Sequence, residues 1–104
     1  MQHKRGDSWS YIGIADIRSP DGTLIDLTGW GIASEGRTGS GALVQTFSMD
    51  WIDPVAQTYS MQAMNTRDWK LGTLNLDIQF SSPSGFVIST PTAAIEIVND
   101  VTKV

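Results

Sequence analysis

Apolar and polar residues alternate strictly along several long stretches of this chain. The first, residues 43–51, places on one face Leu43, Phe47, Met49 and Trp51. The second, residues 55–63, places on one face Val55, Tyr59, Met61 and Ala63. The third, residues 74–80, opposes polar residues with Leu74, Leu76, Ile78 and Phe80. Because side chains of a strand point alternately to its two faces, each stretch predicts a strand with one buried face and one solvated face.

Turn residues divide the chain into about seven expected strands, at residues 7–17, 24–27, 30–37, 43–51, 55–63, 73–80 and 86–98. Between them lie predicted turns at 19–22, 53–54 and 82–85, a glycine-rich hairpin loop at 36–42 and a single helical turn at 65–71. Pro91 cannot donate to a ladder, so it marks an edge, a bulge or a break in the last strand. Gly13 suggests a bulge or a close backbone approach in the first.

Short strands separated by frequent turns predict an all-β fold, an immunoglobulin-like antiparallel β-sandwich of about seven strands. We expect one domain at residues 7–100, with a flexible N-terminal lead-in at 1–6 and a C-terminal tail at 101–104. The predicted core includes Trp9, Leu24, Leu27 and the alternating apolar residues. In the first strand Ile12 and Ile14 have the opposite parity to Trp9, which suggests a strand that switches sheets or is covered on two sides.

Composition excludes several classes of function. The 104 residues carry a net charge of −4, which repels phosphate backbones, so no nucleic-acid partner is expected. The chain has no cysteine, which rules out disulfides, thiolate metal sites and cysteine nucleophiles. No apolar run approaches the roughly 20 residues of a membrane span, and none suits a signal peptide. We expect Met1 to be a true start, and the chain to be a whole small protein made in a reducing cytoplasm.

Residues able to do chemistry are sparse. His3 is the single histidine, in a segment predicted to be flexible, and is interpreted as an incidental surface residue. Asp50 and Asp53 could act as a carboxylate pair or hold a calcium ion, although a turn at Asp53-Pro54 explains them better. The tripeptide at 5–7 matches an integrin motif and residues 36–41 resemble a phosphate loop, but a turn and a hairpin account for both. The sequence therefore predicts no enzyme, no metal and no cofactor.

Three residues are the predicted contacts to a partner: Trp30, Arg37 in the 36–42 loop, and Trp69. Trp69 lies between Asp68 and Lys70, so partial exposure is expected. Three uses of its ring remain open: contact with a partner protein, a half-buried lid over the sandwich, or contact with a sugar. Trp51 shares its parity with Phe47 and is assigned to the core.

Several segments resemble a family of small β-sandwich modules in tailed bacteriophages and prophages, similar to the N-terminal domain of baseplate upper proteins and to tail-fibre-associated proteins. The resemblance lies in residues 5–9 (RGDSW), residues 19–30 (SPDGTLIDLTGW), residues 71–73 and 77–80, and the pairs at 84–85 and 89–90. The 19–30 segment, a DG turn followed by DLTG and an aromatic residue, is the most distinctive part. Ile25 stands where proline is frequent in the family, and Leu74 where an aromatic residue is frequent.

The resemblance implies a non-enzymatic virion structural protein of a tail, baseplate, neck or fibre, made in the host bacterial cytoplasm. Its partners would be other phage structural proteins, and it would be a homo-oligomer or part of a larger assembly. The family's fibre region is absent, so a stand-alone accessory subunit is expected. The alternatives are a capsid decoration protein and a carbohydrate-binding module that aids host attachment. The family implies no catalytic residues.

Overall fold

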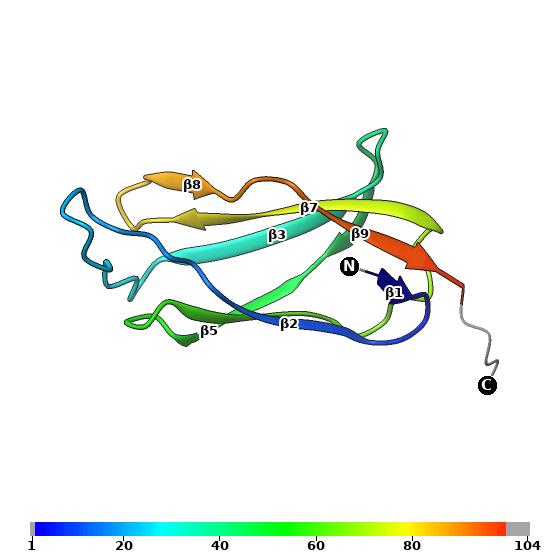
Figure 1. The fold of residues 1–104 in the computed structure, drawn as a ribbon, viewed down its shortest axis with the longest axis horizontal. Helices are drawn as coiled ribbons and strands as arrows, with labels where there is room; N and C mark the ends of the chain where they lie inside the picture. Colours follow the sequence, from blue (N-terminus) through cyan, green and yellow to red (C-terminus); the bar gives the residue numbers. More distant parts are fainter. Residues whose placement is uncertain (1, 100–104) are drawn as a thin grey trace.

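The computed structural model describes residues 2–99, which form nine strands. In chain order these are β1 (Gln2–Lys4), β2 (Trp9–Ile14), β3 (Gly31–Arg37), β4 (Leu43–Thr46), β5 (Ser48–Asp53), β6 (Thr58–Ala63), β7 (Gly72–Ser81), β8 (Val87–Ser89) and β9 (Ala93–Val98). Figure 1 shows them stacked in two layers along one long axis. The fold is therefore all-β, as predicted.

Two sheets face each other as an immunoglobulin-like sandwich. The larger sheet has the order β1-β9-β7-β3-β4, with β8 pairing β7, and the smaller sheet has the order β2-β6-β5. Neighbouring strands are antiparallel except for the parallel pair β1–β9. In Figure 1 the smaller sheet lies below the larger one, and the sheet edges run along the length of the molecule.

The alternating residues of β6 and β7 fill the space between the sheets, as the parity of the sequence predicts. Val55 is the exception: it lies in the turn before β6 and is 61% exposed, so its predicted place on the buried face is wrong. Buried side chains include Tyr59, Met61, Ala63, Leu74, Leu76, Ile78 and Phe80. Trp9 of β2 and Ile95 of β9 join the same cluster. Gly13 makes the predicted close approach, since a Cβ built there would lie 2.6 Å from the Tyr59 hydroxyl oxygen. Glycine at this position lets the Tyr59 ring pack directly on the β2 backbone.

The stretch 43–51 is two strands in different sheets, so the prediction of one continuous strand is wrong. The chain leaves the larger sheet after Thr46 and enters the smaller one at Ser48, while the Phe47 side chain stays buried between them. Leu43, predicted to face the core, is 52% exposed at the hairpin end of β4. Alternation continues across the crossing because both strands turn one face to the same core.

Residues 24–27 do not form the predicted strand. They belong to a crossing segment, residues 15–30, whose regular pairing is limited to a bridge between Arg18 and Leu24. Leu27 is fully buried as predicted, whereas Leu24 is exposed and its assignment to the core is wrong. Gln57 fastens this segment: its side-chain amide bonds both backbone groups of Ile17 at 2.7 Å and the Ile25 carbonyl at 2.8 Å.

Both ends of the described chain also differ from expectation. Residues 2–4, inside the predicted flexible lead-in, form β1 on the edge of the larger sheet. The predicted helical turn at 65–71 is a non-helical turn closed by Trp69 N–H donating to the Thr66 carbonyl at 3.0 Å. The predicted break at Pro91 is confirmed, because the last strand is divided into β8 and β9. The predicted tail at 101–104 lies outside the described residues.

The turns of the crossing segment make one prediction about pH. Hydrogen bonds from the Thr28 hydroxyl and N–H lower the pKa of Asp26, and those from the Ser19 hydroxyl and Thr23 N–H lower the pKa of Asp21. A carboxylate with a lowered pKa stabilises the fold above its unfolded pKa, and this stability is lost as the pH falls through the folded pKa. We expect the melting temperature to decrease when the pH is lowered below about 4.

The variant Asp26→Asn keeps the side-chain acceptor of the turn but removes the titration. We expect its melting temperature to fall less between pH 5 and pH 2 than that of the parent protein. The matched control is Asp50→Asn, because none of the described residues donates a hydrogen bond to the Asp50 carboxylate. An acid transition that is identical in the parent protein and the Asp26→Asn variant would contradict the prediction.

Candidate interaction surfaces

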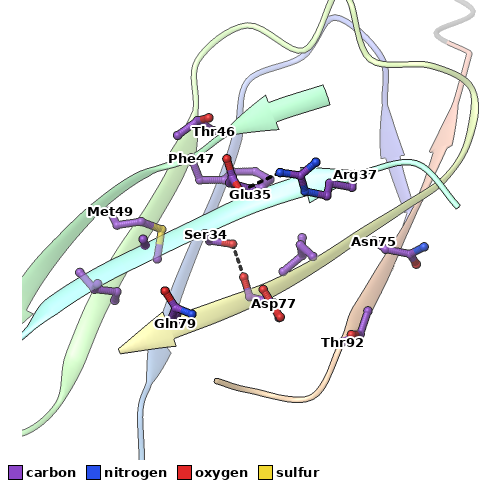
Figure 2. Close-up of a pocket in the computed structure, with 13 residues that line it drawn as sticks. Ser34, Glu35, Arg37, Thr46, Phe47, Met49, Asn75, Asp77, Gln79 and Thr92 are labelled. Carbon is purple, nitrogen blue, oxygen red and sulfur yellow. Dashed lines mark hydrogen bonds and ion pairs between the residues drawn. The ribbon is translucent and has the colours of Figure 1, made fainter. Parts of the chain in front are cut away.

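A groove of about 650 Å³ lies beside β3 and β7, where the chain leaves β4 (Figure 2). Its lining residues include Glu35, Arg37, Thr46, Asn75, Asp77, Gln79 and Thr92. Glu35 lies directly across from Asp77 in the strand register, and Arg37 pairs with Glu35 at 3.1 Å. The Ser34 hydroxyl donates to the Asp77 carbonyl. The side chains of Glu35, Arg37 and Asp77 are exposed to solvent.

The side chains of His3 and Asp53 have structural roles. His3 is half-buried rather than a free surface residue: its Nε2 atom lies 2.9 Å from the Asp7 carbonyl and 3.2 Å from the Thr66 hydroxyl. Its ring centroid is 5.3 Å from that of Trp69. Asp53 accepts hydrogen bonds from the N–H groups of two residues of its own turn, which confirms the turn interpretation. These contacts tie down β1 and the β5–β6 connection.

The two sequence motifs also belong to turns. In the 5–7 tripeptide, Asp7 N–H donates to the Lys4 carbonyl at 3.2 Å and Gly6 N–H to the Thr66 hydroxyl at 2.8 Å. Residues 38–42 close the β3–β4 hairpin, where Gly41 N–H donates to the Thr38 carbonyl. Among residues 2–99, no group of three or more metal-ligating side chains is found, and no helix is long and apolar enough to cross a membrane.

The predicted contact residues are not brought together. Trp69 is 2% exposed, so the expected partial exposure is wrong; its indole N–H donates to the Gln45 amide oxygen at 3.0 Å. Trp30 is half-buried against the core, and its carbonyl accepts the Trp51 indole N–H at 2.9 Å. Arg37 is exposed but bonds Glu35 and the Gly41 carbonyl within its own hairpin. Trp69 offers no surface to a partner, and Trp51 is only partly buried.

An exposed apolar surface lies instead on the outer face of the smaller sheet. We call it the isoleucine face: Ile12 and Ile14 of β2, Ile52 of β5, and Val55 of the turn between β5 and β6. Their exposures are 70%, 64%, 56% and 61%. The β6 residues between the two strands are Thr58, Ser60 and Gln62. The β5 residues paired with Ser60 and Thr58 are the exposed Asp50 and Asp53, so two carboxylates lie beside the apolar side chains. Apolar residues gathered on one exposed face commonly mark a protein interface.

The sequence held one signal of this face. Ile12 and Ile14 have the parity opposite to Trp9, so their side chains leave the core side of β2. A strand with apolar residues on both faces is expected to be packed against other parts of the protein on both faces. In the structure β2 is packed on its inner face only. Ile52 likewise has the parity opposite to Trp51, but the register shift between Trp51 and Asp53 and the order of the strands could not be predicted from parity.

Comparison with known proteins adds no relative. A scan against models of protein families finds no match, and a search of curated proteins finds none either. The exposed surfaces of the chain are therefore the structural basis for assigning it a role.

Proposed function

We propose that this protein is a non-enzymatic structural subunit of a bacteriophage particle, placed in a tail, baseplate, neck or fibre and held there by protein–protein contacts. The observation that carries the assembly role is the isoleucine face, which exposes apolar side chains on an otherwise compact sandwich. The phage setting comes from the resemblance of the 19–30 segment to tail-associated modules. The protein would be made in the host cytoplasm and function in the virion.

The chemistry of the described side chains fits a passive role. Its single histidine and the Asp53 carboxylate both hold local backbone in place. The carboxylates of the groove are solvated, and one of them is paired with Arg37. A subunit that binds through surfaces rather than reacting needs only a rigid core and an exposed face.

The alternatives differ in their support. A capsid decoration protein would use the same isoleucine face, so only the location in the particle separates it from a tail subunit. A carbohydrate-binding module needs exposed aromatic rings, and its sequence candidates were Trp30 and Trp69. Since Trp69 is buried and Trp30 half-buried, this pair provides no platform for a sugar.

Purified particles test the proposal. We expect quantitative mass spectrometry to find this protein at a fixed copy number relative to the other structural proteins of the particle. Separating tails from capsids before the measurement places it: a tail fraction supports the tail or baseplate role and a capsid fraction the decoration role. Absence from particles whose major capsid and tail proteins are detected would refute a virion role.

A further inference from the structure

The outer edge of β2 leaves backbone hydrogen-bonding groups without a partner. Ala15 N–H donates to the Gln57 carbonyl at 3.0 Å, so alternate residues of β2 from Trp9 to Ala15 direct their backbone groups toward β6. The N–H and C=O groups of Ser10, Ile12 and Ile14 therefore point away from the sheet. Within residues 2–99, β2 pairs with β6 alone.

The β2 edge also lacks the features that prevent the other edge strands of this protein from pairing with another chain. Natural proteins protect edges with short strands, charged side chains, prolines and bulges. Strands β1 and β8 have three residues each and β4 has four, while β5 carries Asp50, Asp53 and a register shift. The six residues of β2, Trp9–Ile14, contain no charge and no proline, and two exposed isoleucines flank the free backbone.

We propose that β2 pairs antiparallel with β2 of a second copy, across a two-fold axis at Ile12, joining two smaller sheets into one continuous sheet. In this register Ile12 faces Ile12 of the second copy, and Ser10 faces Ile14. Each of these residues exchanges both backbone hydrogen bonds with its partner. The two copies thereby satisfy one another's free N–H and C=O groups, and their isoleucine side chains meet on the outer face.

The inner face of the strand brings Tyr11 near the two-fold axis in this register. Tyr11 is 41% exposed and would stand opposite Gly13 of the second copy. The space over that glycine is already filled by the Tyr59 and Tyr11 rings of its own copy, so the incoming ring would have to pack against these rings. The two Tyr11 rings lean toward the axis, since each already lies over the Gly13 of its own strand. The support for a second copy therefore comes from the free backbone groups of β2 and from its outer face.

Size and charge predict how strong the pairing is. A strand of this length spans about 20 Å, and its edge contact is smaller than the roughly 800 Å² per partner of a standard interface. The dimer is therefore weak and forms at high local concentration, as in an assembly. Each copy carries a net charge of −4, so salt that screens this repulsion should strengthen the association.

Engineered cysteines test the register, because the chain has no cysteine of its own. Paired residues have Cα atoms about 5.5 Å apart, within disulfide range. We expect Ile12→Cys to form a covalent dimer on mild oxidation at least about tenfold faster than Ser10→Cys, whose two sulfurs would be separated by about 14 Å along the strands. The double variant Ser10→Cys/Ile14→Cys should cross-link as readily as Ile12→Cys. Equal rates for Ile12→Cys and Ser10→Cys would overturn the proposal.

Sedimentation measures the same contact without cysteines. We expect the parent protein to self-associate as its concentration rises, Ile12→Lys to remain monomeric, and the control Ile52→Lys, on β5, to associate like the parent. Both isoleucines are exposed, so neither change should alter the melting temperature. The proposal would also be overturned if the parent protein stays monomeric at millimolar concentration, or if its β2 edge pairs only with a strand of a different protein. This inference deepens the proposed assembly role, but it is measured on isolated protein, so its failure leaves the particle test untouched.

Discussion

Replacing Trp69 with alanine is expected to lower the free energy of unfolding by about 3–5 kcal/mol, as is typical for a large aromatic side chain removed from a core. The ring is 2% exposed, packs edge-on against Phe47 with centroids 6.0 Å apart, and lies 5.3 Å from the His3 ring. Its loss opens a cavity where the β1 edge, the 64–71 turn and the crossing at Phe47 meet. Chemical denaturation followed by circular dichroism measures the change.

Two variants separate the ring from its hydrogen bond. Trp69→Phe keeps most of the packing and loses the bond to Gln45, which predicts a cost of about 1 kcal/mol. Phe86→Ala removes an aromatic side chain that is 61% exposed and should stay within about 0.5 kcal/mol of the parent protein. If Trp69→Ala were as stable as Phe86→Ala, the buried position of the indole would be wrong.

Local parity was enough to predict the strands that stay within one sheet. β6 and β7 bury alternate residues as their sequences indicate, and the turn at 82–85 lies where its proline and glycine place it. The crossing at Phe47 could not be predicted in this way. A strand that changes sheets keeps its core-facing parity, because both sheets face the same core, and only the pairing partners reveal the change.

The other wrong predictions concern residues whose environment depends on strands that are distant in the sequence. β1 is a polar three-residue segment whose strand character depends on β9, more than ninety positions away in the chain. Trp69 is flanked by charges that suggested exposure, yet its neighbours point outward and the indole inward. The isoleucine face was visible as parity on β2, but its extension to Ile52 required the sheet order. Trp30 and Arg37 make hydrogen bonds within the chain, and their contacts with a partner stay predictions.

Gln57 has the core-facing parity of Tyr59 but was not among the residues predicted for the core, and its replacement by alanine is the second large effect that we expect. The side chain is fully buried, and its amide bonds the N–H and C=O of Ile17 and the C=O of Ile25. Alanine leaves the Ile17 N–H and the Ile25 C=O in the interior without partners, while the Ile17 C=O keeps its bond from the Ile25 N–H at 3.2 Å. Since each unpaired buried group costs about 1–3 kcal/mol and such costs overlap, we expect a loss of about 3 kcal/mol.

The exposed Gln62→Ala, on the outer face of β6, is the matched control and should change the free energy of unfolding by less than about 0.5 kcal/mol. Hydrogen exchange adds a readout that a general loss of stability would not reproduce. Because Gln57 alone joins the Ile17 and Ile25 backbones to the sandwich through its side chain, Gln57→Ala should speed exchange in residues 17–27 more than in β7. Uniform acceleration along the chain would mean that the crossing segment is held by its apolar side chains, with Leu27 foremost, rather than by this amide.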